Sequence, residues 1–214
     1  MYADGRRSFV QEAPDFDSIT SRLAIWHTYD AAVKAELYST CLATVAGICL
    51  IDPIPLQKRA LDSLISSSRV TGIVVTNSNH RRAAAQFAQQ FQVCIFAHRQ
   101  TFPDDEPSQL TTTVDGDEIS NGLRVIGIEG AAPGEIALHY SDNGGTLIVG
   151  DALVNFEPYG FSFLPPKYCS DEKQMRGSLQ KLLHYKADRI LFAHGTPILS
   201  SASERFRGLL NSNV

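Results

Sequence analysis

The chain has 214 residues, of which 43% are hydrophobic and 20% are charged, and its formal net charge is −4. This length and composition predict one globular domain, residues 1–214, with a substantial hydrophobic core. The slight acidic excess argues against a nucleic-acid-binding protein, which would need a basic face. No apolar run approaches the roughly 20 residues that a membrane-spanning helix needs, which argues against a membrane protein.

The cysteines and the start of the chain indicate a compartment. The first residues include arginines but no apolar segment typical of a secretory signal. Three of the four cysteines, Cys41, Cys49 and Cys94, lie inside apolar runs, and no C-x-x-C pair includes them or Cys169. We interpret the cysteines as buried free thiols in a reducing environment, which predicts a cytoplasmic protein.

In the first half of the chain, strands precede helices. Residues 1–18 have no clear period and are interpreted as an extended N-terminal arm. Short β-rich runs follow at residues 23–27, 37–45 and 48–51. A helix is expected over residues 56–67, a buried strand over 73–75, a helix over 84–91 and a parallel strand over 93–96. This order predicts a sheet that ends in a β-α-β-α-β unit.

The second half repeats that order after a polar surface loop at residues 97–110. Strands are expected at residues 123–128, 136–140 and 146–149, with a hairpin turn at Asn143-Gly144-Gly145. An aromatic loop, residues 155–170, precedes a helix with Met175, Leu179, Leu182 and Leu183 on one face, a strand at 189–193 and a last helix with Phe206, Leu209 and Leu210. Two such halves predict an α/β fold, a four-layer αββα sandwich with helices on the outer faces only and the 73–75 and 189–193 strands in different sheets.

Polar side chains stand at the ends of these strands. Asp151 follows a buried strand in TLIVGD, and His194 follows another in RILFAHG. Ligands of layered α/β proteins gather at the carboxyl ends of strands, so both side chains are expected near a site. A third candidate is the strand-to-helix junction VVTNSNHRRAAAQF, where Asn79 can cap the helix and His80 can begin it.

Five segments occur in the order and spacing of one known family: IDP before a helix, VVTNSNH before a helix, APGEIALHY, LIVGDAL and ILFAHGTP. On these motifs the chain resembles the metallo-β-lactamase superfamily over about residues 21–200. The resemblance implies the αββα sandwich of that family. It also implies a site where a T-H-x-H-x-D-H loop, a later His before P-G, a strand-end Asp and a strand-end His bind two metal ions. Those ions activate water to hydrolyse ester, amide, thioester or phosphoester bonds.

The chain departs from the family pattern at the later histidine and in the first motif. Ala131, in GAAPGE, stands where the family has the His before P-G. Counting forward from Thr76, Asn77 and Asn79 replace both histidines of the first motif, Arg81 its aspartate and Arg82 its last histidine.

Counting backward from the helix AAAQFAQQFQV gives a different correspondence. His80 becomes the last histidine of the motif, Asn79 stands at its aspartate, and the loop is two residues shorter. We adopt the backward count, because the spacing of residues within a helix varies less than the length of a loop.

With this count, the resemblance implies that the first metal position has lost its histidines and that the second keeps His80, Asp151 and His194. Two imidazoles and a carboxylate with open coordination positions suit a single zinc, iron or manganese ion. Asn77, Asn79 and Arg81 are predicted to line the ligand pocket beside it. The chain is therefore expected to be a divergent member that resembles metal-dependent hydrolases, with at best one metal ion and an unidentified small-molecule substrate.

A metal-free interpretation stays open beside this one. Asp151 would then accept backbone N–H bonds in a turn, or pair with Arg81, Arg82 or a protonated His80 or His194. His194 would be a hydrogen-bonded structural residue, and His80 an exposed residue of the first helical turn. The function would be that of a non-catalytic descendant, which binds a small molecule or a protein partner.

The aromatic segment 155–170, NFEPYGFSFLPPKYCS, follows Asp151 closely. If Asp151 lines a pocket, this segment passes beside its mouth. It either walls an apolar ligand or forms a subunit contact of a homo-oligomer.

Overall fold

The computed structural model describes residues 11–120 and 122–212, so residues 1–10 of the predicted N-terminal arm lie outside the described part of the chain. The rest of the arm is extended and attached to the first half. Ala13 exchanges backbone hydrogen bonds of 3.0 Å with Pro55 and Gln57, and β1 (Asp17–Ser18) pairs with the following strand.

The first sheet has seven strands in chain order. Its first part is an antiparallel meander and its second part is parallel, as the sequence predicted. The strands after β1 are β2 (Leu23–Asp30), β3 (Ala35–Thr44), β4 (Gly47–Ile51), β5 (Val70–Val75), β6 (Ile95–Ala97) and β7 (Leu110–Thr112).

The second sheet has five strands in the order β14-β11-β10-β9-β8. Only β11 and β14 pair in parallel, while β10 runs antiparallel to β11 across the predicted hairpin turn. Its strands are β8 (Glu118–Ile119), β9 (Leu123–Gly127), β10 (Ile136–Tyr140), β11 (Thr146–Val149) and β14 (Arg189–Phe192). The antiparallel pairing brings the amino end of β10 beside the carboxyl end of β11.

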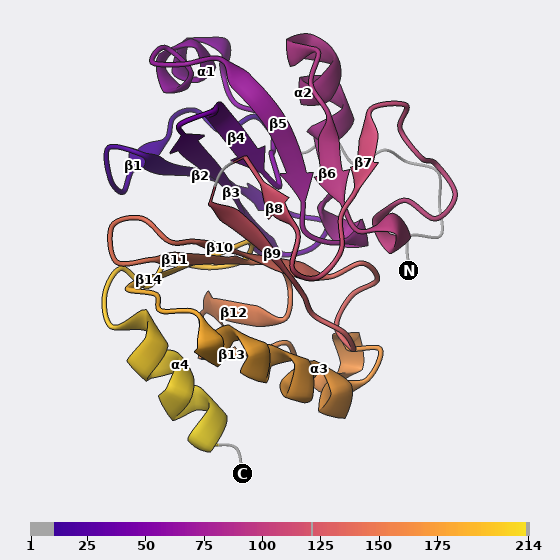
Figure 1. The fold of residues 1–214 in the computed structure, drawn as a ribbon, viewed down its shortest axis with the longest axis vertical. Coiled ribbons are helices and arrows are strands. Elements are labelled where there is room, and N and C mark those ends of the chain that lie inside the picture. Colours follow the sequence, from indigo (N-terminus) through magenta and orange to yellow (C-terminus); the bar gives the residue numbers. More distant parts are fainter. Residues whose placement is uncertain (1–10, 121, 213–214) are drawn as a thin grey trace.

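Helices cover the outer faces of the two sheets (Figure 1). They are α1 (Lys58–Leu64) and α2 (Ala84–Phe91) on the first sheet, and α3 (Glu172–Leu179) and α4 (Ala202–Asn211) on the second. Short 3-10 turns are η1 (Ser78–His80), η2 (Arg99–Thr101), η3 (Pro166–Tyr168) and η4 (Gln180–His184). Within residues 11–120 and 122–212, no helix is long and apolar enough to cross a lipid bilayer.

Three buried hydrophobic clusters separate the four layers. Ile73 of β5 packs under α1 and α2, whereas its neighbour Val74 faces the second sheet. Ile190 of β14 packs under α3 and α4, whereas Leu191 faces the first sheet. The predicted αββα sandwich, with β5 and β14 in different sheets, is confirmed.

The aromatic segment is not the loop that the sequence predicted. Most of it forms a two-stranded hairpin, β12 (Leu153–Phe156) and β13 (Gly160–Phe163). Leu153 and Phe163 lie opposite each other and join the hydrophobic cluster under α3, and the Arg176 guanidinium lies 4.3 Å from the Phe163 ring centre. The alternation of apolar and polar residues within this segment is the signal of a strand pair.

Two further predictions are wrong in detail. Leu183 does not share the buried face of Met175, Leu179 and Leu182 but is 40% exposed, because the helix tightens into η4 after Leu179. Cys94 is exposed and Cys169 is partly exposed, so only Cys41 and Cys49 are the buried free thiols that were expected.

Candidate functional site

The candidate site lies where strands of both sheets end. Asn77 lies two residues beyond β5, and its Oδ1 accepts a hydrogen bond of 2.8 Å from the backbone N–H of Asn79, which caps η1. This tight turn places the side chain of His80 inward. Asp151 lies two residues beyond β11, and His194 two residues beyond β14.

Tertiary contacts hold the segment of His194. Asn155 of β12 pairs with Gly195, and the backbone N–H of Asn155 donates to the carbonyl of His194 (3.2 Å). Gly195 has a φ of +105°, and a Cβ there would lie 2.1 Å from the Asn155 carbonyl oxygen. Only glycine therefore allows this exit from β14.

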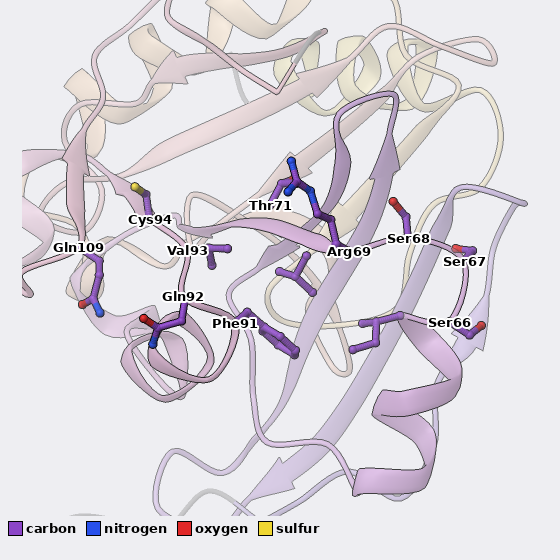
Figure 2. Close-up of a pocket in the computed structure, with 12 residues that line it drawn as sticks. Ser66, Ser67, Ser68, Arg69, Thr71, Phe91, Gln92, Val93, Cys94 and Gln109 are labelled. Carbon is purple, nitrogen blue, oxygen red and sulfur yellow. The ribbon is translucent and has the colours of Figure 1, made fainter.

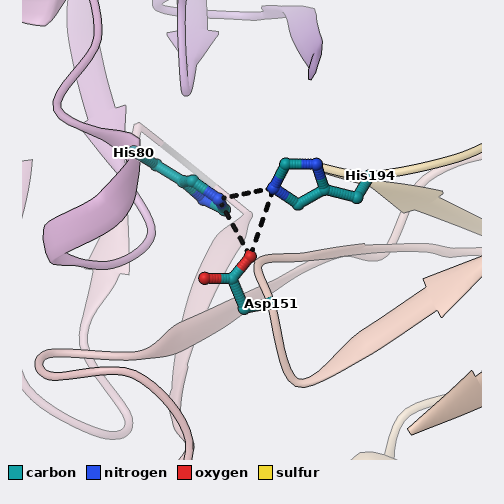
Figure 3. A group of neighbouring side chains, drawn as sticks. All are labelled: His80, Asp151 and His194. Carbon is teal, nitrogen blue, oxygen red and sulfur yellow. Dashed lines mark hydrogen bonds and ion pairs between the residues drawn. The ribbon is translucent and has the colours of Figure 1, made fainter. Parts of the chain in front are cut away.

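His80, Asp151 and His194 converge, as the sequence predicted (Figure 3). Asp151 Oδ1 lies 3.1 Å from Nε2 of His80 and 3.3 Å from Nε2 of His194. The two Nε2 atoms are 3.3 Å apart. The side chains of His80, Asp151 and His194 are 1%, 10% and 16% exposed, so His194 is the member of the group most open to solvent.

Each imidazole is oriented through its other nitrogen. Nδ1 of His80 lies 3.0 Å from Oδ2 of Asp52, and Nδ1 of His194 lies 3.1 Å from the backbone carbonyl oxygen of Glu36. Both partners accept hydrogen bonds, which assigns the proton of each ring to Nδ1 and leaves Nε2 free to bind a ligand. The sequence did not identify either partner.

Asp52 is a buried carboxylate at the end of β4. Its Oδ1 accepts a hydrogen bond from the backbone N–H of Thr76 (2.8 Å), and its Oδ2 accepts one from the Thr76 hydroxyl (2.6 Å). The carboxylate thus ties β4 to the end of β5 and to His80. A signal existed in the sequence, because Asp52 follows an apolar strand as Asp151 does.

Glu135 is a second buried carboxyl group that sequence reasoning missed. It is 4% exposed, and it accepts hydrogen bonds from the Asn77 side chain (2.6 Å) and the backbone N–H of Ala152 (3.0 Å). Glu135 precedes β10, so a search for polar residues at the carboxyl ends of strands does not find it. The antiparallel pairing of β10 with β11 brings it to the same edge as Asp151.

Of the partners that the metal-free interpretation offered to Asp151, the structure brings the histidines and not the arginines to its carboxylate. Arg82 is partly buried and donates to the backbone carbonyls of Tyr38, Asp52 and Ala193. Arg81 is exposed and lies 5.6 Å from the ring centre of Phe102. The partners of the Asp151 carboxylate are instead the two imidazoles and the Asn79 side chain, whose Nδ2 donates to Oδ2 (2.9 Å).

This arrangement agrees with the backward count of the first motif. His80, and not Arg82, faces Asp151 and His194. His80 is also buried, so it is not the exposed first-turn residue of the metal-free interpretation. Of the three residues predicted to line a pocket, Asn79 contacts Asp151, Asn77 contacts Glu135, and Arg81 extends toward Phe102. Ala131 is buried and has only a methyl group at the position of the family histidine.

Charges inside the site shift its protonation. Burial by itself lowers the pKa of His80, but the carboxylates of Asp151 and Asp52 outweigh burial and raise that pKa to about 9. Burial opposes ionisation of Asp151, yet the two imidazoles hold the pKa of this carboxyl well below its ordinary value. Burial lowers the pKa of His194. Without a metal ion, the shared proton therefore belongs to His80.

The remaining carboxyl groups behave differently from each other. Burial and the charge of Asp151 raise the pKa of Glu135 to about 8, against the hydrogen bonds from Ala152 and Asn77. Burial would also raise the pKa of Asp52, but His80 and Arg82 hold it below its ordinary value. Neutral pH thus leaves Asp52 ionised, whereas Glu135 releases its proton less readily than an ordinary glutamate.

The donor set of this group fits one divalent metal ion. Nitrogen and oxygen ligands at 2.0–2.2 Å from a tetrahedral zinc ion lie roughly 3.3 Å from each other. The three separations between the facing atoms of His80, Asp151 and His194 are 3.1, 3.3 and 3.3 Å. The Asp52–His80 contact is the carboxylate–histidine pair that typically orients a metal ligand.

A groove of about 820 Å³ lies at the amino ends of β5 and β6, whereas the candidate site lies at the carboxyl end of β5 (Figure 2). It is lined by the segment before β5, including Arg69, and by the segment before β6, including Cys94. Its lining residues include no histidine and no carboxylate. The groove is therefore separate from the group of His80, Asp151 and His194 and lacks its chemistry.

Comparison with known proteins agrees with this fold. A family model described as the metallo-β-lactamase superfamily matches residues 18–213. A crystal structure of DIM-1 metallo-β-lactamase exposed to ceftazidime aligns with a TM-score of 0.73 and 12% identity, over 95% of this chain and 100% of that chain. A metallo-β-lactamase from Pontibacter korlensis gives 0.72 and 16%, over 92% and 98%.

A metallo-β-lactamase family protein from Thermus thermophilus gives a TM-score of 0.64 and 18% identity, over 91% of this chain and 81% of that chain. No curated protein gives a significant match. At these identities the structural similarities show the fold alone, while the family model covers nearly the whole chain.

Proposed function

The chain belongs to the metallo-β-lactamase superfamily, and from this premise we propose that it binds one divalent metal ion on His80, Asp151 and His194 in a hydrolase-like site. The observation that carries the proposal is the geometry of the three facing atoms, which are separated as metal ligands are. Zinc, iron and manganese all accept two imidazoles and a carboxylate. When bound, such an ion supplies Lewis acidity and lowers the pKa of water.

The residues around the ligands have defined tasks in this proposal. Asp52 and the Glu36 carbonyl keep the imidazole protons on Nδ1. Asn79 holds Oδ2 of Asp151, so that Oδ1 faces the imidazoles. Access for water or a substrate is expected on the side of His194 and Asn79, because His80 is covered.

One ion, and not two, follows from the side chains at the first metal position. Asn77 uses its amide in hydrogen bonds with Asn79 and Glu135. Ala131 has no ligand atom in its side chain. A two-metal site stabilises the attacking and the leaving group with its two ions, and this site lacks the side-chain ligands for one of them. We therefore propose a divergent, hydrolase-like member whose substrate is a small molecule.

A specific observation favours a second candidate, a metal-free descendant that binds a small molecule or a protein partner. A single proton on Nε2 of His80 would satisfy Asp151 Oδ1 and His194 Nε2 together. The cations His80 and Arg82 would then balance the carboxylates Asp52 and Asp151. The two candidates differ in whether a metal ion or a proton occupies the centre of the group.

Metal analysis separates the two candidates. Protein purified without added metal or chelator is expected to contain about one divalent ion per chain, and chelation is expected to lower its melting temperature. Asp151→Asn should remove both the ion and the response to chelator. The control Asp62→Asn makes the same change at an exposed ion pair on α1 and should behave as wild type. Protein that holds no metal and binds none on titration would establish the metal-free candidate.

A further inference from the structure

A chain of hydrogen bonds leads from Glu135 to the metal-ligand group. Oε1 of Glu135 accepts from the backbone N–H of Ala152, directly after Asp151 (3.0 Å). Oε2 accepts from Nδ2 of Asn77 (2.6 Å), and Oδ1 of Asn77 accepts from the backbone N–H of Asn79 (2.8 Å). One buried carboxyl group therefore contacts both segments that carry His80 and Asp151.

The chain closes on the carboxylate of Asp151. Nδ2 of Asn79 donates to Oδ2 of Asp151 (2.9 Å), which leaves Oδ1 to the two imidazoles. Backbone contact supports the same alignment, because the N–H of Ser78 donates to the carbonyl of Pro133 (3.0 Å). The 131–135 segment, which lacks the family's metal ligand, thus still holds η1.

The direction of each hydrogen bond is determined by the backbone. The N–H groups of Ala152 and Asn79 can only donate, so Glu135 and Asn77 must each present an oxygen to them. Asn77 then has only its NH₂ group to present to Glu135. Position 135 must consequently offer two acceptor oxygens, which a carboxyl group has and a carboxamide has not.

The space around these groups is filled. A Cβ at Gly150 would lie 2.6 Å from Oε1 of Glu135, 2.8 Å from the Thr76 hydroxyl and 3.0 Å from Nδ2 of Asn77. Close packing of this kind limits the movement of the carboxyl group and of the Asp151 segment above it.

We propose that Glu135, acting through Asn77 and Asn79, is a positioning residue that holds His80 and Asp151 at the separation of metal ligands, in place of the lost first-site ligands. This inference rests on the proposed function. Outer contacts of this kind typically change metal affinity 10- to 100-fold when they are removed.

Zinc affinity tests the proposal. In Glu135→Gln the carboxamide must place its NH₂ group against either the NH₂ group of Asn77 or the backbone N–H of Ala152, so we expect zinc to bind at least about tenfold more weakly than to wild type. Glu129→Gln is the matched control, since Glu129 is an exposed glutamate whose side chain, among the described hydrogen bonds, accepts only from Gln174. Zinc affinity equal to wild type in Glu135→Gln would overturn the proposal.

The double variant Glu135→Gln with Asn77→Asp is the rescue. It keeps the number of carboxyl groups, and it reverses only the bond between the two side chains, because the new carboxamide donates to the new carboxylate. Both backbone N–H groups keep an acceptor. We expect the double variant to recover most of the zinc affinity. A correctly folded double variant that binds as weakly as Glu135→Gln would contradict the proposal, and it also provides the test if the single variant does not fold.

A second readout separates this inference from the proposed function. Two-bond ¹H–¹⁵N spectra of chelator-treated protein report the tautomer and protonation state of His80 and His194. We expect these signals to change in Glu135→Gln and to return in the double variant, even if wild type were to bind no zinc. Unchanged imidazole signals in Glu135→Gln would show that the hydrogen-bond chain positions nothing.

Discussion

Oδ2 of Asp52 lies 3.0 Å from Nδ1 of His80. The carboxylate comes from the end of β4 and the imidazole from the turn after β5, so a contact between neighbouring strands aims Nε2 of His80 at Asp151. Asp52→Asn is expected to reverse this orientation. The new NH₂ group would donate to Nδ1, and the ring proton would move to Nε2, where it blocks a metal ion. We expect zinc affinity to fall roughly tenfold or more, measured by competition with a chelating dye.

Thermal unfolding accompanies that measurement, since Asp52 also accepts two hydrogen bonds from Thr76. An asparagine keeps one acceptor oxygen for the Thr76 N–H, so the variant should still fold. Asp62→Asn serves as the control for the same substitution on the surface. A folded Asp52→Asn protein with unchanged zinc affinity would show that the carboxylate does not orient His80.

The pH dependence of stability should reveal His80 in chelator-treated protein. The pKa of His80 is raised to about 9 in the folded state, from an ordinary value of 6.5. A raised pKa means that the folded state binds the proton more tightly than the unfolded state. The stabilisation is complete below the unfolded pKa and disappears as the pH rises through the folded pKa.

Urea unfolding at several pH values checks this expectation. Between about pH 7 and pH 10, wild type should lose on the order of a few kcal/mol more of its free energy of unfolding than His80→Gln does. His184→Gln, at an exposed histidine of η4, should follow wild type. Parallel curves for wild type and His80→Gln would mean that the imidazole carries no shifted proton.

Generic substrates of two-metal hydrolases should be turned over slowly or not at all. Asn77 is engaged with Glu135, and Ala131 offers a methyl group, so the first metal position has no side-chain ligand there. We expect a β-lactam, a phosphodiester and a thioester to show rates near background, in assays with added zinc or manganese. Fast metal-dependent hydrolysis that His194→Ala abolishes would refute this prediction.

The cysteines should differ sharply in reactivity. Burial raises the pKa of Cys41 and of Cys49 to about 12, so their reactive thiolate forms are scarce near neutral pH. Cys94 is exposed. Mass spectrometry after brief alkylation of the native protein should find Cys94 modified and Cys41 and Cys49 intact. The same reagent in denaturant should modify all three, and native labelling of Cys49 would show that the space between the sheets opens.

Much of the fold was predictable from the sequence because its central elements are defined by local patterns. The strands β5 and β14 are buried on both faces, and their continuous apolar sequences are typical of central strands. In α2, Ala84, Phe87 and Ala88 follow the helical spacing i, i+3, i+4 and are buried. The hairpin β12–β13 escaped prediction because its short alternation was masked by its aromatic residues and prolines.

The same dependence on local sequence patterns determined which residues of the candidate site could be predicted. Asp151 and His194 stand two residues after apolar strands, and His80 follows from the phase of α2, so sequence alone indicated these three side chains. Glu135 and the Glu36 carbonyl became visible only in the tertiary structure. Glu135 reaches the site because β10 runs antiparallel to β11, and the Glu36 carbonyl is a backbone group that every residue has. Strand ends are determined by neighbours in the chain, whereas the partners that orient each imidazole come from segments that meet only when the two sheets pack.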